Sequence, residues 1–124
     1  MAILTDTGVR KAGFIVSEAN DWRSRDEVTL TVGADATIVA GTVLGKITAS
    51  GKYIVQLAAG ADGSQTPAAI LYANVSGNSE DITVTVVARD AEVNGAELTY
   101  DPAANAAAIT TANAELAAVG IIVR

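Results

Sequence analysis

Two segments of the chain alternate between polar and apolar residues, and this pattern predicts strands with one face on a core. The first is residues 27–32, EVTLTV, and the second is residues 82–86, ITVTV, which continues into two more apolar residues. Successive side chains of a strand point to opposite faces, so a period of two leaves one side polar. We therefore expect both segments to lie in a sheet that covers a core.

The stretch 41–75 holds the strands around which the rest of the chain is expected to pack. Two runs rich in β-branched residues, 43–48 and 53–57, are separated by only four residues. This separation suits a hairpin built on a type I turn. A loop-forming segment follows at 59–67, and residues 68–73 are continuously apolar, which indicates a strand buried on both faces.

The C-terminal part of the chain predicts one helix and one short strand. Asp101 and Pro102 suit the N-cap and first position of a helix, and at least the latter half of residues 103–119 is expected to be helical. The apolar positions with helical spacing are Ile109, Ala112, Leu116 and Val119. Gly120 is expected to end the helix, and residues 121–123 form an apolar strand or tail.

Three glycines predict special backbone geometry. Gly41 and Gly45 flank the start of the expected hairpin, where tight bends or close approaches of two backbone segments favour glycine. Asn94 and Gly95 form a pair that favours a turn with positive φ.

The chain is expected to divide into an N-terminal arm, residues 1–26, that is flexible in the free protein, and a single β-rich domain, residues 27–124. Residues 1–12 mix polar and charged side chains with single apolar ones and show no sustained period. Such a segment buries too little apolar surface to offset its own ordering entropy.

The aromatic and apolar residues of this arm have two interpretations, and the sequence leaves both open. Phe14, Ile15 and Val16 form an apolar trio, and Trp22 lies within a charged segment. In the first interpretation, Phe14 and Trp22 simply close one end of the core. In the second, the trio adds as a strand to another chain, and the aromatic side chains anchor it.

Composition favours one domain with a thin core. The chain has 124 residues, and aromatic residues make up only 4% of them. The core must therefore consist of Val, Ile, Leu and Ala, and such a chain is expected to gain stability from partner subunits. The net charge of −6 argues against nucleic-acid binding, because an acidic surface repels phosphates.

Targeting and membrane signals are absent from the sequence. No apolar run approaches the roughly 20 residues of a membrane span. The first residues lack the basic start and apolar centre of a signal peptide, so we expect synthesis in a cytoplasm without export.

The residue types exclude most catalytic chemistry. The chain has no Cys and no His, which removes thiol nucleophiles, imidazole bases, Ser-His-Asp systems and most zinc or iron sites. Asp90, Glu92 and Glu97 could suggest a Mg²⁺ or Ca²⁺ site, but their spacing is not that of a calcium loop, and a solvated acidic rim is favoured. Residues 60–64 lack the frame of a phosphate-binding loop. We expect no catalytic, cofactor or metal site.

Six segments, taken in order, resemble the head decoration protein family of tailed bacteriophages. They are FIVSEANDWRSRDEVTL, AGTVLGKIT, GKY, ADGSQTPAAILYANV, ARDAEVNGAEL and ELAAVGIIVR. The resemblance runs from Phe14 to Arg124, and it is carried by the order and spacing of the segments. The chain departs from the family pattern at Thr110 and Thr111, within the expected helix, and around Trp22.

The resemblance implies a mainly β fold, β-clip-like or β-barrel-like, with one short C-terminal helix and an N-terminal arm. It implies a homotrimer that binds the outside of an expanded phage head and stabilises it against the pressure of packaged DNA. The partner would be the major capsid protein, and Phe14, Ile15 and Val16 would pair with its strands, with Trp22 as a further suspected contact.

A second function class stays open at this point. A small non-catalytic β-domain of a phage tail or cell surface could bind carbohydrate. Such sites use exposed aromatic rings that stack on sugars, and the chain offers few candidates: Phe14, Trp22, Tyr53, Tyr72 and Tyr100.

Overall fold

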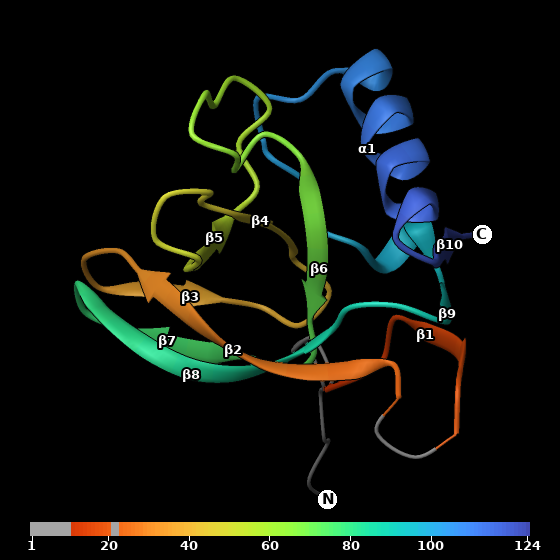
Figure 1. Cartoon of the computed structure of the whole chain (residues 1–124), viewed down its shortest axis with the longest axis horizontal. Coiled ribbons are helices and arrows are strands. Elements are labelled where there is room, and N and C mark those ends of the chain that lie inside the picture. Colours follow the sequence, from red (N-terminus) through yellow and green to blue (C-terminus); the bar gives the residue numbers. More distant parts are fainter. Residues whose placement is uncertain (1–10, 21–22) are drawn as a thin grey trace, which may run out of the picture.

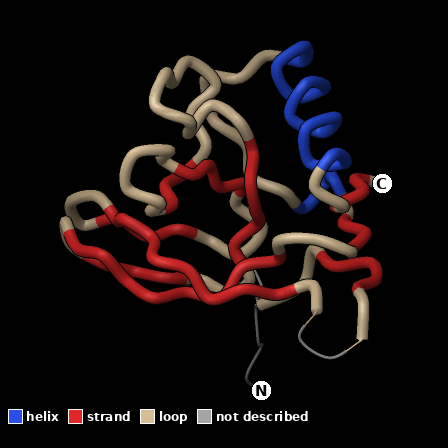
Figure 2. Tube along the Cα trace, in the orientation of Figure 1, coloured by secondary structure: helices blue, strands red, loops and turns tan. Residues whose placement is uncertain are grey.

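The computed structural model of the chain describes residues 11–20 and 23–124, and its centre is a closed barrel of five strands (Figure 1). Around the barrel the strands are β2 (Arg25–Val32), β5 (Tyr53–Val55), β4 (Val43–Lys46), β6 (Pro67–Leu71) and β8 (Glu80–Val87). Strands and loops dominate the trace, and one helix stands beside the barrel (Figure 2). The mainly β fold with a C-terminal helix is confirmed.

The longest pairing in the barrel joins the two segments that alternate in sequence. Strands β2 and β8 run antiparallel in an unbroken register from Arg25↔Val87 to Val32↔Glu80. Leu30, Val32 and Val86 are buried, whereas Thr29 and Thr83, which are opposite each other, are exposed. The period of two therefore places one face of this ribbon on the core.

The predicted hairpin and the buried strand after it are also present. Strands β4 and β5 pair antiparallel through Leu44↔Val55 and Lys46↔Tyr53. Strand β6 lies between β4 and β8, and nearly all of its residues are buried. One face of β6 packs inside the barrel through Ala69 and Leu71, and the other packs beneath α1 through Ile70, so both faces are covered, which explains its continuously apolar sequence.

The glycines of the hairpin have the expected role, but the Asn94-Gly95 turn was predicted wrongly. A Cβ on Gly45 would lie 2.2 Å from the carbonyl oxygen of Ser64, and Gly41 has a φ of +89°. Gly95 does not have a positive φ and instead begins the 3₁₀ turn η1 (Gly95–Glu97). The Asn94 side chain caps this turn by accepting a hydrogen bond from the Ala96 amide.

A second, three-stranded sheet joins distant parts of the chain. Its order is β1 (Ile15–Glu18), β9 (Ala91–Val93) and β10 (Ile121–Val123), with β9 antiparallel to β1 and parallel to β10. Separately, β3 (Ala36–Ile38) pairs antiparallel with β7 (Val75–Gly77).

The described structure does not divide at residue 26. Strand β2 begins at Arg25, and β1 already belongs to a sheet of the folded domain. Residues 1–10 and 21–22 of the expected arm lie outside the described residues, so the flexibility of the arm in the free protein stays a prediction.

Helix α1 (Ala106–Ala118) begins later than the sequence predicts. Its N-cap is Asn105, whose side chain accepts a hydrogen bond from the Ala108 amide. Asp101 was the wrong choice because its carboxylate accepts bonds from the amides of Ala103 and Ala58, which ties a turn to a neighbouring loop. Gly120, with a φ of +91°, follows the C-cap as expected.

The core consists of two clusters of buried apolar side chains. One lies within the barrel and includes Leu30, Leu44, Leu71 and Val86. The other lies between the barrel, α1 and the three-stranded sheet, and includes Phe14, Ile70, Leu116 and Ile121. Within residues 11–20 and 23–124, no helix has the length and apolar character that a membrane span requires.

Candidate interaction surface

The three apolar residues of the predicted capsid contact, residues 14–16, differ in how far their side chains are buried. The Phe14 side chain is only 2% exposed and belongs to the core, as the first interpretation of the sequence expects. Its carbonyl oxygen also accepts a hydrogen bond from the Asn94 amide. Ile15 is half-buried against the same cluster, whereas the Val16 side chain is 58% exposed. Trp22 lies outside the described residues.

Val16 lies on an open edge of the three-stranded sheet. Strand β1 is the outer strand of the order β1-β9-β10, and a bulge between Ile15 and Ser17 interrupts its pairing with β9. The side of β1 that faces away from β9 pairs with no strand in the described part of the chain. An open edge presents backbone donors and acceptors to which an extended segment of another chain can add.

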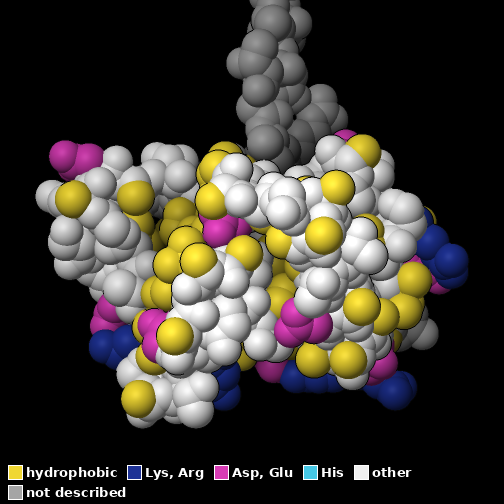
Figure 3. Space-filling model, turned by 90° about the horizontal axis from the view of Figure 1, so that it is seen from above, with side chains coloured by type: hydrophobic (Ala, Val, Ile, Leu, Met, Phe, Trp, Pro, Cys, Tyr) yellow, Lys and Arg dark blue, Asp and Glu magenta, His cyan; other side chains and the backbone are white. Residues whose placement is uncertain are grey.

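Exposed apolar side chains concentrate at this end of the molecule. Of the four large apolar side chains that are exposed within residues 11–20 and 23–124, three are Val16 on β1, Val119 at the end of α1 and Ile122 on β10. The fourth, Leu57, follows β5 in the barrel. On the face seen in Figure 3, hydrophobic side chains form several small groups among backbone atoms and other side chains.

The C-terminal end of β1 is fixed by an ion pair that sequence analysis did not find. The Arg25 guanidinium forms a salt bridge with Glu18, and the Ser24 hydroxyl donates to the same carboxylate. The hydrogen bond from Arg25 holds the pKa of Glu18 below its ordinary value, with Ser24 adding to the effect and burial opposing it. Because both side chains are largely buried, removal of either partner would leave the other charge poorly solvated.

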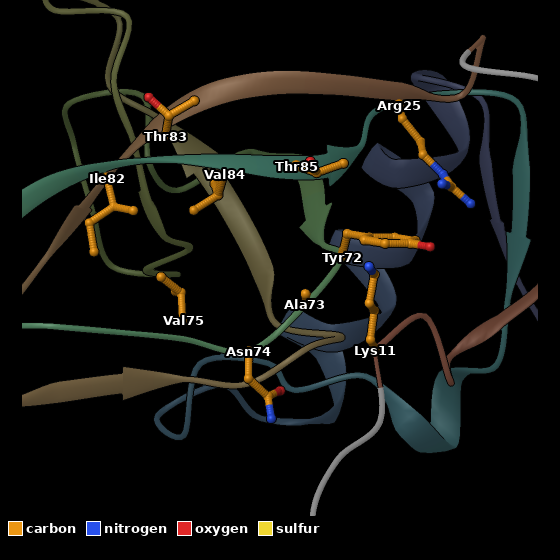
Figure 4. Close-up of a pocket in the computed structure, with 10 residues that line it drawn as sticks. All are labelled: Lys11, Arg25, Tyr72, Ala73, Asn74, Val75, Ile82, Thr83, Val84 and Thr85. Atoms are coloured by element: carbon orange, nitrogen blue, oxygen red, sulfur yellow. The ribbon is translucent and has the colours of Figure 1, made fainter.

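Arg25 also stacks on Tyr72, which lies just after β6. The guanidinium carbon is 4.3 Å from the centre of the Tyr72 ring, and the Lys11 ammonium is 5.2 Å from it. Figure 4 shows the ring with Arg25 on one side and Lys11 on the other. The Ala12 amide donates to the Tyr72 carbonyl, so the first described residues are attached to the barrel at this point.

A second group of ion pairs surrounds the start of β2. Arg89 pairs with Asp26 and donates to the Arg23 carbonyl, and Arg23 pairs with Asp90. The hydrogen bond from Arg89 to Asp26 raises the pKa of Arg89. These partners are far apart in sequence, and no local spacing signals them.

A groove of about 360 Å³ lies beside Tyr72 (Figure 4). Lys11, Arg25 and Tyr72 form one end, and Val75, Ile82 and Val84 form its apolar wall. The groove was not expected from the sequence, because its two sides come from β8 and from the segment that leads into β7.

Two of the three carboxylates that could suggest a metal site, Asp90 and Glu92, form ion pairs with arginines. Asp90 pairs with Arg23, and Glu92 pairs with Arg124 at 3.1 Å. Among residues 11–20 and 23–124, no three His, Cys, Asp or Glu side chains gather closely enough to hold a metal ion. The loop at residues 60–64 is organised by Asp62, which accepts hydrogen bonds from the amide and hydroxyl of Ser64.

Comparison with known families gives one match. A family model described as bacteriophage lambda head decoration protein D matches residues 4–121. The matched range includes all five strands of the barrel, helix α1, and strands β1 and β9 of the second sheet. No curated protein matches the chain. The family match confirms the resemblance that the six sequence segments indicate.

Proposed function

The chain belongs to the bacteriophage lambda head decoration protein D family, and from this premise we propose that it binds as a trimer to the outside of an expanded phage head. Membership gives the chain a structural role in decorating a phage capsid. We propose further that the bound trimer stabilises the shell against the pressure of packaged DNA. The protein would be made in the host cytoplasm and then act without catalysis.

Trimer formation is supported by the distribution of apolar side chains. The core contains one Phe and otherwise Leu, Ile, Val and Ala, and Val16, Val119 and Ile122 remain exposed at one end of the molecule. Burial of a large apolar side chain contributes about 1.5–3 kcal/mol when it is complete. Contacts with neighbouring copies or with the head would remove these three side chains from water.

We propose that the major capsid protein binds at the open edge of β1 and to residues that precede Lys11. Val16 would be buried in that contact, while Phe14 and Ile15 would hold β1 in place from the core side. Trp22 remains a proposed contact because its segment is close in sequence to β1 and β2. Three weak attachments on one trimer would reinforce one another through their effective concentration.

The family match over residues 4–121 is the observation that carries this proposal. The positions of the aromatic side chains also argue against carbohydrate binding. Phe14 is buried, and Tyr53, Tyr72 and Tyr100 are half-buried against other side chains. The described residues thus offer no exposed aromatic ring for stacking on a sugar.

Co-sedimentation with heads tests the proposal. The full chain should pellet with expanded heads and bind unexpanded heads much less, and decorated heads should survive a higher temperature than bare ones. Val16→Asp should weaken binding by at least tenfold, since it places a charge in the contact. Leu57→Asp is the matched control, because Leu57 is 45% exposed but far from β1 in sequence and sheet. Equal pelleting with both head forms, or none, would refute the proposal.

Light scattering on the bound and released protein tests the trimer separately. The protein released from heads should have the mass of three chains at high concentration. A monomer in dilute solution is compatible with assembly at the shell. A monomer on the head itself would remove the trimer from the proposal.

A further inference from the structure

The groove beside Tyr72 lies between two consecutive strands that do not pair with each other. Strands β7 and β8 are joined by only Asn78 and Ser79, yet β7 pairs with β3, and β8 pairs with β2 and β6. Near the turn, the Ile82 side chain packs against Gly77. A Cβ added to Gly77 would lie 2.9 Å from the Cδ1 atom of Ile82. From there the strands separate toward Tyr72, and the space between them is the groove (Figure 4).

The edge of β8 that borders the groove has backbone groups available for pairing. The Thr85 carbonyl accepts a hydrogen bond from the Tyr72 amide, so the backbone of Thr85 points away from β2. In a strand, residues i and i+2 direct their N–H and C=O groups to the same side. The N–H and C=O of Thr83 therefore point to this same edge, where β8 pairs with β6 only at Val86 and Val87 in the described part of the chain.

The two ends of the groove differ in polarity. Val75, Ile82 and Val84 are half-buried and give it an apolar wall. At the other end, Lys11 is exposed and contacts the Tyr72 ring, and within the described residues its ammonium has no carboxylate partner. Arg25 lies on the other side of the ring, although its charge is already paired with Glu18.

We propose that this groove receives an extended, acidic peptide segment of the head shell, which adds to the edge of β8 at Thr83. Apolar side chains of the segment lie against Val75, Ile82 and Val84, and a carboxylate pairs with Lys11. That the segment belongs to the head shell rests on the proposed function, whereas its extended and acidic character is argued from the groove alone.

An open strand edge, an apolar wall and one cation fit a peptide better than a nucleic acid. Binding to a phosphate backbone depends on several cations at once, and the chain has a net charge of −6. Strand addition supplies affinity through backbone hydrogen bonds, and the side-chain pockets supply selectivity. The volume of about 360 Å³ is in the lower part of the ~300–1,000 Å³ range of ligand pockets, which suits a short segment.

Titration with a blocked pentapeptide, Val-Glu-Val-Thr-Val, followed by amide NMR, tests the chemistry without heads. The amides of Thr83 and Thr85 should shift, and the peptide should bind about two- to fivefold more tightly than its Gln counterpart, as for one exposed ion pair. Lys11→Glu should abolish that preference. Lys46→Glu is the matched control, because the Lys46 ammonium also lies over a tyrosine ring, 6.0 Å from the centre of Tyr53.

Two results of the titration would overturn the proposal. One is the absence of shifts at Thr83 and Thr85 at millimolar peptide. The other is a Lys11-dependent response to a single-stranded oligonucleotide that exceeds the response to the peptide, which would assign the groove to nucleic acid.

Co-sedimentation with expanded heads tests the source of the segment. Lys11→Glu and Thr83→Pro should each bind heads at least threefold more weakly than the unmodified chain. Thr83→Pro removes a backbone N–H that does not point toward β2. Melting temperatures should show that both variants are folded. Lys46→Glu should bind as the unmodified chain does. If the unmodified chain binds heads and both groove variants bind equally well, the inference is wrong and the proposed function stands. If the unmodified chain does not bind heads, the proposed function fails, and the peptide titration alone decides the chemistry of the groove.

Discussion

Replacement of Phe14 by alanine separates the two interpretations of the N-terminal segment. The side chain is 2% exposed and packs with Leu116 and Ile121 in the cluster beneath α1. Its ring also approaches Gly41, since a Cβ built there would lie 3.6 Å from the ring. Removal of such a side chain leaves a cavity that the backbone around Gly41 cannot fill.

The expected cost of Phe14→Ala is about 3–5 kcal/mol, the usual range for Phe→Ala in a core. A domain of this size has a total stability of about 5–15 kcal/mol, so the loss is a large part of it. For a chain of this length, each 1 kcal/mol lowers the melting temperature by about 3–5 °C. Phe14→Ala should therefore melt on the order of 10–20 °C lower than the unmodified chain.

Guanidinium and thermal unfolding, followed by circular dichroism at a fixed protein concentration, measure the effect. The control is Val16→Ala, two residues along the same segment, where a 58% exposed side chain should cost less than about 0.5 kcal/mol. Phe14→Ala with an unchanged transition would show that this residue does not belong to the core of the free protein. In that case the segment acts as an arm from residue 14 onward.

Three further changes test other parts of the structure. Gly45→Ala should prevent stable folding or cost more than about 3 kcal/mol in a denaturant titration, because its Cβ would lie 2.2 Å from the Ser64 carbonyl oxygen. The control is Gly33→Ala, since the space around a Cβ at Gly33 is open. Equal stability of the two variants would refute the close approach at Gly45. Glu18→Gln should cost about 1–3 kcal/mol at pH 7, since Arg25 loses its charged partner. The pKa of Glu18 is lowered in the folded state, so its contribution is present above the ordinary glutamate pKa of about 4.3 and is lost as the pH falls through the folded pKa. Melting curves below pH 5 should accordingly converge for the unmodified chain and Glu18→Gln, and a constant gap down to pH 2 would contradict this linkage. EDTA should leave the melting temperature unchanged, and a loss of stability that one divalent ion restores would show that the carboxylates around Asp90 bind metal.

The sequence predicts the barrel strands well because each has a local signature. The alternation in residues 27–32 and 82–86 marks β2 and β8, and the continuous apolar run after Pro67 marks β6. Gly120 marks the end of α1 for an equally local reason, since a helix commonly ends in the left-handed region that glycine favours.

The features that the sequence did not predict depend on contacts between distant segments. Asp101 has the local properties of an N-cap, but its carboxylate accepts a hydrogen bond from the amide of Ala58, which is far away in the sequence. Phe14 is compatible with an arm until β9 is placed beside β1. The stack of Lys11, Tyr72 and Arg25 likewise exists only once β6 and β2 are in the barrel.

The arrangement of β1, β9 and β10 also sets an order on biosynthesis. All five strands of the barrel end by Val87, so every barrel segment is synthesised before α1 and β10. Strand β10 and the Leu116 and Ile121 side chains that pack with Phe14 come from the last nine residues of the chain. The Phe14 cluster is therefore completed only once residues 116–121 have been synthesised and are free to pack, and a polypeptide truncated before Leu116 lacks the packing that holds β1 in place.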